Sequence, residues 1–300
     1  MIVAVALIVS ITFLLLQFMP GSPFNDIKLT PEQREILNEK YHLNDPIPVK
    51  YVRYVKNLFH GDLGTSFVYN NQPVSSMISR RISCSVRIGL QALVVGTVIG
   101  VLLGMVAALK RNSIWDHLTT LIAVIGVSIP AFVIGSLLQY LLCVKVHVFP
   151  VLYNPKDEIS SFLPTFSLSF SVIATTAKYM RNELVDIINS DYILFARSKG
   201  LTGREVIWKH AVRNALIPVV TIMGPMTVSL ITGSTVVERI YSVPGLGNLL
   251  VNSIQNNDYF VILGIGLVLS LMFLSVVLIV DILYGLIDPR IRLAGGDSNE

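Results

Sequence analysis

Long stretches without Asp, Glu, Lys or Arg constrain this chain more than any other feature of its sequence. A helix that crosses a bilayer needs about 20 mainly apolar residues, and six uncharged stretches are long enough. They cover residues 1–25, 88–109, 118–144, 159–177, 215–237 and 259–280. Only 14% of the residues are charged, against about 25% in an average soluble domain. The sequence therefore predicts an all-α integral membrane protein with six transmembrane helices.

The first stretch, residues 1–25, has the length of either a membrane helix or an extended signal peptide. It has no basic n-region and no small-residue cleavage site, and both are expected of a signal peptide. We therefore expect an uncleaved first transmembrane helix.

Lysine and arginine in the short loops predict the orientation, because cytoplasmic loops carry an excess of both. With the N-terminus inside, the inner segments 110–117, 178–214 and 285–300 hold two, seven and two of them, and the short outer loops 143–160 and 236–260 hold two and one. The balance favours a multi-pass protein with both termini in the cytoplasm. The long loop 20–87 holds nine more, but the charge rule applies poorly to a loop of that length.

These assignments divide the chain into four parts. They are a first transmembrane helix at 1–25, an extracellular helical loop at 26–87, a core of five helices at 88–284 with a cytoplasmic loop at 178–214, and a cytoplasmic tail at 285–300. In the extracellular loop, Thr30 followed by Pro31 and Gln33 predicts a capped helix start. Pro48 to Phe59 predicts a second helix, with Val52, Val55, Leu58 and Phe59 on its apolar side.

The sequence SDYILFARSKGLTGREVIWKH, at 190–210, interrupts the apolar stretches with six charged residues. Ser190 or Asp191 is a suitable N-cap for a helix that begins at Tyr192. Gly200 stands where a left-handed residue ends such a helix, and Leu201 is placed to fold back onto it. Next, Thr202 and Glu205 have the spacing of a capping box, so a second helix is expected to run on towards Pro218.

A helix of two turns, from Tyr192 to Lys199, is not stable alone in water and must pack on something. One interpretation lays it on the membrane surface, with its apolar side in lipid and its basic residues near anionic headgroups. The other docks it into a soluble partner. The residues alone leave both interpretations open.

A resemblance separates the two. The sequence DYILFARSKGLTGREVIWKHAVRNALIPVV resembles the cytoplasmic loop of binding-protein-dependent ABC importer permeases in its peptide-transporter form, with Ala196, Gly200 and Pro218 at the recognisable positions. The family pattern begins Glu-Ala-Ala, whereas this chain has Leu194, Phe195 and Ala196 there. Five other motifs resemble the B-type permease subunit of oligopeptide and dipeptide importers: MPGSPF, YHLNDPIPVKY, GDLGTSF, YSVPGLGNLLVNSIQNNDYFVI and DILYGLIDPRI.

The resemblance implies a type-1 ABC importer permease fold in a bacterial plasma membrane. It implies four kinds of partner: a homologous second permease, two cytoplasmic ATPases, an external peptide-binding protein and the lipid membrane. No nucleic acid is expected. The loop 178–214 would couple to the ATPases through Asp191, Tyr192, Phe195, Ala196, Arg197, Lys199, Gly200 and Leu201. Permeases for dipeptides, nickel or haem share much of the pattern, so they are the alternative on cargo.

The sequence has no G-x-x-x-x-G-K-[ST] phosphate loop, so this chain is not expected to be the ATPase. ATP and Mg²⁺ would be bound by partner subunits, and we expect no cofactor, metal site or catalytic residue here. A single-chain ion-coupled transporter is the rival interpretation. Such proteins place ionisable residues inside the bilayer, and the six stretches contain no acidic or basic residue.

Neutral hydroxyl groups are the pathway-lining candidates, because they can exchange hydrogen bonds with a peptide backbone. The candidates are Ser169, Thr176, Thr221, Ser229 and Thr232. The alternative is that most of these hydroxyls bond to carbonyls of their own helix. Pro244, Gly245 and Gly247 predict a turn in the last outer loop, where the resemblance implies the outer end of the pathway.

Gly96, Gly100 and Gly104 form a small-residue stripe at four-residue spacing. Such a stripe allows another helix to approach closely. We expect it to pack within this chain, with contact to a second permease as the alternative.

The predicted topology is testable by cysteine labelling. Cys84 lies near the end of the predicted outer loop and should react with an impermeant thiol reagent added to intact cells. A single cysteine introduced as Ser198→Cys, in a Cys84→Ser and Cys143→Ser background, should react only after the membrane is opened. Labelling in the opposite sense would show that the chain has the reverse orientation.

Overall fold

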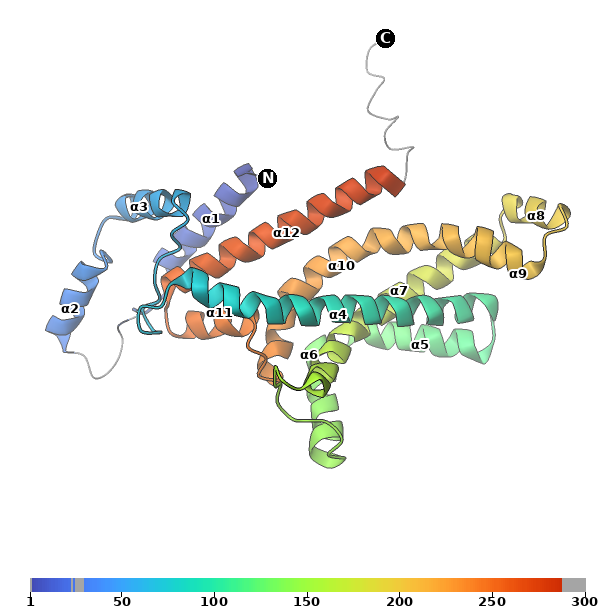
Figure 1. Cartoon of the computed structure of the whole chain (residues 1–300), viewed down its shortest axis with the longest axis horizontal. Helices are drawn as coiled ribbons and strands as arrows, with labels where there is room; N and C mark the ends of the chain where they lie inside the picture. The colour runs from blue at the N-terminus through green and yellow to red at the C-terminus, as the bar shows by residue number, and fades with distance from the viewer. Residues whose placement is uncertain (1, 23, 25–29, 288–300) are drawn as a thin grey trace, which may run out of the picture. The chain divides into compact units, whose positions relative to one another are not determined.

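The computed structural model describes residues 2–22, 24 and 30–287, which are almost entirely helical (Figure 1). The described residues contain no strand beyond a single β-bridge between Thr65 and Pro73. The all-α prediction is therefore confirmed. The chain forms two compact units, which we describe separately. The first joins Met1–Ser85 with Pro244–Leu274, and the second joins Val86–Val243 with Ser275–Glu300.

The first unit holds α1 (Ile2–Gln17), α2 (Pro31–Lys40), α3 (Ile47–Phe59), α11 (Leu246–Gln255) and the N-terminal parts of α4 (Val74–Leu109) and α12 (Tyr259–Ile287). The capping box of α2 is confirmed: the Gln33 backbone N–H donates to the Thr30 hydroxyl, and the Thr30 N–H donates to the Gln33 side chain. Val9, Phe13 and Leu16 of α1 pack with Ile262 and Leu263 of α12 and with Tyr54 of α3.

The apolar face predicted for α3 is partly wrong. Tyr51, Tyr54, Val55 and Leu58 pack into the core, whereas Val52 and Phe59 are exposed. The two tyrosine rings bury more apolar surface against Phe13 than Val52 could, so they set the rotation of the helix.

The predicted extracellular segment runs to residue 87, and α4 begins within it, at Val74. Val74, Met77, Ile78 and Ile82 recur at helical spacing and pack with Leu246 and Leu249 of α11. This packing extends the helix well before its uncharged stretch begins at residue 88. The PGLG sequence at 244–247 also differs from the prediction, since Gly245 is the N-cap of α11 and the turn lies before it.

Asp258 joins the start of α12 to the loop that precedes α4. Its buried carboxylate accepts hydrogen bonds from the Ser66 hydroxyl and, at 3.1 Å, from the Phe67 backbone N–H. Burial raises the pKa of the Asp258 carboxyl, and the hydrogen bonds from Ser66 and Phe67 oppose that rise. The interaction holds together segments almost 200 residues apart in the sequence.

In the second unit, α7 (Phe162–Ile188) is the central helix. Around it pack α5 (Ile114–Ser128), α6 (Ala131–Leu138) and α10 (Val212–Ile240). Short π-helical and 3-10 segments complete the unit: η1 (Gln139–Lys145), η2 (Glu158–Ser161) and η3 (Val206–Ala211). Pro130 separates α5 from α6, and the two segments bend by 104°, as expected of a residue that lacks a backbone donor. Pro218 and Pro225 lie inside α10, which continues through both.

The glycine stripe of α4 packs against α7, which confirms packing within the chain. A Cβ atom at Gly96 would lie 2.6 Å from Val172, and one at Gly100 would lie 2.7 Å from Thr176. At Gly104 it would lie 2.6 Å from the backbone oxygen of Ala177. Only glycine permits this approach of the two helices.

Three described helices are long and apolar enough to cross a membrane: Val74–Leu109, Glu158–Ile188 (η2 with α7) and Tyr259–Val280. The bent pair Ile114–Ser128 and Ala131–Lys145 makes a fourth if it counts as one crossing, and Val3–Gln17 is a shorter apolar helix. The structure thus supports three to four of the six predicted crossings. The predicted tail, 285–300, lies outside the described residues from residue 288 onward.

Gly104 and Gly89 provide an opposed pair of substitutions within α4. Gly104→Ala should destabilise the protein by about 1–3 kcal/mol, because its Cβ meets backbone that cannot move aside. Gly89→Ala should leave stability unchanged or raise it by up to about 1 kcal/mol, because nothing lies within 4 Å of its Cβ and alanine favours a helix. Thermal unfolding of the purified protein in detergent measures both. Equal effects at the two positions would show that the close contact is not stabilising.

Candidate functional site

The short helix α8 (Asp191–Ser198) begins one residue earlier than predicted. Ser190 occupies the N-cap position in extended conformation, but its hydroxyl donates to the Ile187 carbonyl at 2.6 Å instead of capping α8. Asp191 lies in the first turn, where a negative charge interacts favourably with the helix dipole. The helix is therefore attached to the end of α7 through Ser190.

Gly200 ends α8 as predicted. Its φ is +83°, and its N–H donates to the Arg197 carbonyl at 2.9 Å. A Cβ atom there would have nothing within 4 Å, so glycine is required for the backbone conformation and not for space. A left-handed residue reverses the chain direction here, and the N-cap of the next helix, Thr202, follows only two residues later.

One face of α8 is buried in the protein's own core. Ile193 is 1% exposed and Ala196 7%, in a cluster with Met180 and Leu184 of α7 and with Val206, Ala211 and Val212. Leu201 folds back onto this cluster, as the sequence predicted. The Asn214 side chain also donates to the Tyr192 hydroxyl at 3.1 Å. The two-turn helix is therefore held by the ends of α7 and α10.

The chain after Gly200 has the predicted capping box. The Glu205 N–H donates to the Thr202 hydroxyl at 3.3 Å, and the Thr202 N–H donates to the Glu205 carboxylate at 3.2 Å. Lys209 pairs with Glu205 at 3.3 Å. The sequence predicted a helix that runs on to Pro218, and it does so through α9 (Gly203–Glu205), η3 and α10. The π-helical stretch η3 was not predicted.

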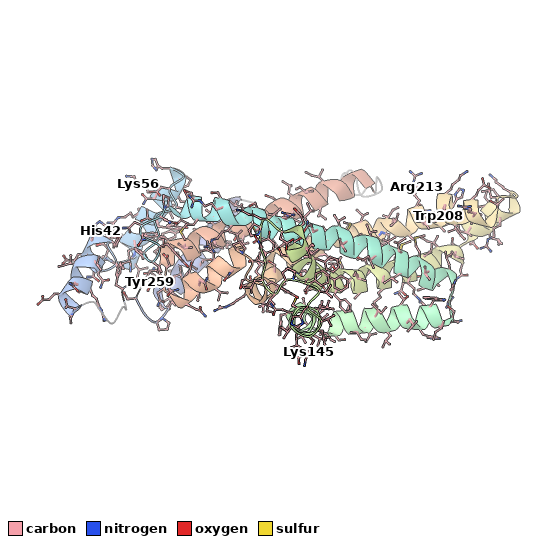
Figure 2. The ribbon with its side chains drawn as sticks, turned by 60° about the horizontal axis from the view of Figure 1, so that its bottom comes forward. His42, Lys56, Lys145, Trp208, Arg213 and Tyr259 are labelled. Atoms are coloured by element: carbon pink, nitrogen blue, oxygen red, sulfur yellow. The ribbon has the colours of Figure 1, made fainter. Side chains whose placement is uncertain are left out.

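The other side of α8 is open and carries large apolar side chains beside the charged Asp191 and Arg197. Tyr192, Leu194 and Phe195 are 42%, 67% and 59% exposed, and Trp208 of η3 is 57% exposed. The Lys199 ammonium lies 4.5 Å from the centre of the Phe195 ring, within cation–π range. Figure 2 labels Trp208 together with Arg213, which lies in the first turn of α10. We call Tyr192, Leu194, Phe195 and Trp208 the coupling face.

The predicted cytoplasmic segment 178–214 includes the ends of two long helices. Helix α7 continues to Ile188 because Met180, Leu184 and Val185 keep an apolar face in the core. The segment between α7 and α10 is therefore only 189–211. All eight predicted coupling residues lie within it, on α8 or the turn after it.

The predicted pathway residues are not brought together. Ser169 and Thr176 are fully buried on α7, where Ser169 donates to the Phe166 carbonyl at 2.9 Å and Thr176 packs on Gly100. Thr221 lines an apolar groove with Thr227 on α10, and Ser229 is exposed. Thr232 lies in α10, outside the residues whose side chains the structure describes. Of the outer-loop candidates, Gly245 caps α11 and Gly247 is buried in its first turn.

Sequence reasoning did not find the ion pair between Asp116 and Arg181. The Asp116 side chain is 5% exposed, and Arg181 donates to its two oxygens at 3.1 and 3.0 Å. Both residues lie just outside the uncharged stretches, so each was counted as a loop residue. Their pairing depends on α5 packing against α7, which neighbouring residues do not reveal.

The fold and this segment together define a class of protein. It is a helical integral membrane protein with a short surface helix held between the ends of two long helices. Residues 100–293 match the family described as binding-protein-dependent transport system inner membrane component. The chain belongs to this family, which makes it a non-catalytic membrane component of a transport system.

Full-length relatives agree with this assignment. The chain is 43% identical over 287 residues to the dipeptide transport system permease protein of Lactococcus lactis subsp. cremoris, which covers 96% of this chain and 94% of that protein. It is 37% identical over 294 residues to the dipeptide transport system permease protein of Bacillus subtilis, covering 98% and 95%. It is 38% identical over 288 residues to the oligopeptide transport system permease protein of Escherichia coli, covering 95% and 94%.

A solved structure supports the fold. The chain superposes on a chain of the crystal structure of an amino acid ABC transporter with histidines, with a TM-score of 0.53 and 17% identity. The match covers 70% of this chain and 93% of that chain. At this identity the likeness concerns the fold alone.

Adjacent residues of α8 test how the helix is held. Ile193→Ala should loosen the helix by about 2–5 kcal/mol, because a buried side chain leaves a cavity. Leu194→Ala should change its stability by less than about 0.5 kcal/mol, because Leu194 is exposed. Hydrogen exchange of residues 190–201 in the purified protein measures both. Equal protection in the two variants would contradict the burial of Ile193.

Proposed function

We propose that this chain is the permease subunit of an ATP-driven peptide importer. The family match identifies the chain as an inner membrane component of a transport system. Three relatives that align over almost the whole chain are permeases of dipeptide or oligopeptide transport systems. These relatives favour peptides over nickel or haem as cargo. The chain crosses a bacterial plasma membrane six times, with both termini in the cytoplasm.

The proposed assembly has the four partners that the resemblance implies. A second permease supplies the other half of the pathway, two cytoplasmic ATPases supply the energy, and an external binding protein delivers the peptide. Because it belongs to a binding-protein-dependent system, the chain requires such a delivery partner. This subunit holds no nucleotide, so it acts by changing conformation when the ATPases close.

The observation that carries the proposal is the two-sided environment of α8. Ile193 and Ala196 join the core at the ends of α7 and α10, while the coupling face stays open and apolar. An ATPase that binds the coupling face would move α8 as it closes. Because α8 packs on the ends of α7 and α10, those helix ends would move with it. The same two helices carry the pathway candidates, among which Thr221 and Ser229 are the most accessible.

The buried positions of Ser169 and Thr176 give them a different part in the proposal. In this structure they contribute to the contact with α4. They would line the pathway only in a state in which α4 and α7 separate.

Gly200→Val tests the coupling. Valine resists a φ of +83°, so the turn after α8 should lose about 1 kcal/mol or more. The complex should still assemble, yet peptide-loaded binding protein should no longer stimulate ATP hydrolysis, and uptake should fall. The measurement is cargo-stimulated ATPase activity of the purified complex in proteoliposomes.

Gly203→Val is the matched control. Gly203 also has nothing within 4 Å of its Cβ, but it is the first residue of α9 with no positive φ. Stimulation should be close to that of the wild type. Unchanged stimulation and uptake in Gly200→Val would mean that the segment is only a surface loop.

A further inference from the structure

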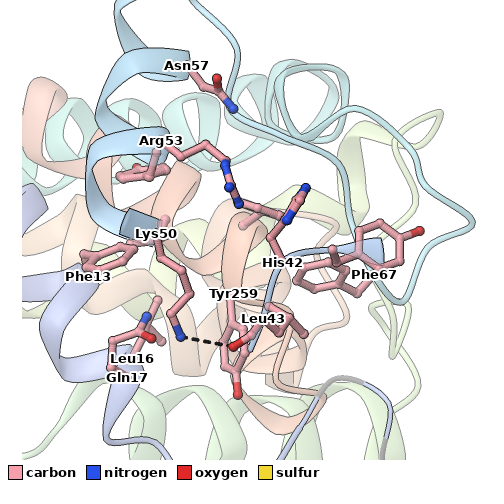
Figure 3. Close-up of a pocket in the computed structure, with 14 residues that line it drawn as sticks. Phe13, Leu16, Gln17, His42, Leu43, Lys50, Arg53, Asn57, Phe67 and Tyr259 are labelled. Atoms are coloured by element: carbon pink, nitrogen blue, oxygen red, sulfur yellow. Dashed lines mark hydrogen bonds between the residues drawn. The ribbon is translucent and has the colours of Figure 1, made fainter. Parts of the chain in front are cut away.

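A small cavity lies within the first unit, away from the coupling face. It has a volume of about 70 Å³ and lies among the end of α1, the turn after α2, α3 and the start of α12 (Figure 3). Its floor is apolar and includes Phe13, Leu16 and Leu263. Lys50, Arg53 and His42 supply basic groups to its lining. The cavity therefore combines an apolar floor with a basic side.

Tyr54 gives this cavity a polar group that the protein does not satisfy. The residue is 5% exposed and stacks on Phe13 with ring centres 5.8 Å apart. Its buried hydroxyl has no hydrogen-bond partner among the residues that the structure describes. Burial raises the pKa of Tyr54 to about 12, so the hydroxyl keeps its proton, and the hydroxyl oxygen has almost no accessible surface in this structure. A buried donor without a partner is costly, and a small shift of the ring towards the cavity would let a ligand acceptor satisfy it.

The charges at the cavity favour an anion. Lys50 donates to the Leu43 carbonyl at 3.3 Å, which leaves two of its three ammonium protons for other acceptors. Arg53 pairs with Asp45 at 2.8 Å, and His42 lies 3.5 Å from the same carboxylate. One acidic residue thus faces two permanent cations and a histidine. His42 also has a φ of +57°, a conformation that residues other than glycine rarely adopt.

The surroundings of the cavity indicate which anion it takes. Its floor is made by the last turns of α1 and the first turn of α12, which are ends of apolar helices. Leu14 and Leu15 of α1 are 47% and 66% exposed, and Phe18, the residue after the helix, is 78% exposed. Such exposure is expected of apolar side chains that face lipid tails. The volume admits roughly five water-sized atoms, which suits a phosphate group and is too small for a peptide.

We propose that this cavity binds the phosphate of an anionic phospholipid, whose acyl chains lie along α1. The Lys50 ammonium donates to the phosphate oxygens, the Tyr54 hydroxyl joins it once the ring shifts towards the cavity, and Arg53 adds positive potential at the rim. Basic pockets beside membrane helices bind lipid headgroups in this way. The bound lipid would hold α1 and α3 together at the membrane boundary.

Tyr54→Phe and Lys50→Gln are the test variants, and Lys56→Gln is the matched control because Lys56 is an exposed lysine of the same helix outside the cavity. The intact complex is placed in nanodiscs of phosphatidylglycerol or phosphatidylcholine, and native mass spectrometry counts the lipids it retains. Wild type and Lys56→Gln should retain phosphatidylglycerol preferentially. Each test variant should bind it roughly tenfold more weakly, the loss expected for one hydrogen bond to a charged group.

Stability separates a binding role from a structural one. In lipid-free detergent, Tyr54→Phe should be at least as stable as the wild type, because the variant removes an unsatisfied buried hydroxyl. Added phosphatidylglycerol should then raise the melting temperature of the wild type more than that of the variant. Equal retention and equal stabilisation in all four proteins would overturn the proposal.

Two further results would replace the lipid with another occupant. Stabilisation by inorganic phosphate without any preference for phosphatidylglycerol would show a site for a free anion. Equal lipid retention together with weaker docking of the binding protein in Tyr54→Phe and Lys50→Gln would show that an acidic group of that protein fills the cavity.

Discussion

The second unit depends on the close contact between α4 and α7. Gly96, Gly100 and Gly104 remove side chains along one face of α4, so that Val172, Thr176 and the backbone near Ala177 lie directly against it. Lipid tails are as apolar as leucine, so helices in a membrane gain little from hiding apolar surface and must gain from close packing. The contact fixes α7, and α7 in turn supports α5, α6 and α10.

The position of α8 follows from this arrangement. Met180 and Leu184 lie at the end of α7 and form the core on which Ile193 and Ala196 pack. A helix of eight residues has little stability of its own, so its shape and place come from that core, from the link through Ser190 and from the left-handed turn at Gly200. The result is a small rigid element with one side in the protein and an apolar side open. Under the proposed function, that combination would let α8 pass the movement of an ATPase partner on to the ends of α7 and α10.

Local features of the sequence predicted the local structure well. The capping boxes at Thr30 and Thr202 and the end of α8 at Gly200 were all predicted, because each depends on residues within one or two turns. The face that a helix turns towards its neighbours was harder. Ser169 and Thr176 looked suitable for a pathway, yet both are buried on α7. Thr176 packs on Gly100 of α4 and Ser169 presents its backbone oxygen to Gly96, and nothing in their immediate sequence indicates this. The Asp116–Arg181 pair and the cavity at Tyr54 join residues far apart along the chain, so only the folded structure reveals them.

The central claim is that the coupling face contacts an ATPase, and site-specific photo-crosslinking in native membranes tests it most directly. A photoreactive amino acid replaces Phe195, which is 59% exposed, or Phe59 of α3, which is 86% exposed and serves as the control. The account predicts that the probe at 195 forms a covalent adduct with an ATPase subunit and that the yield changes when ATP is added. The probe at 59 should form no such adduct. Crosslinking of position 195 to lipid alone, with or without ATP, would contradict the account.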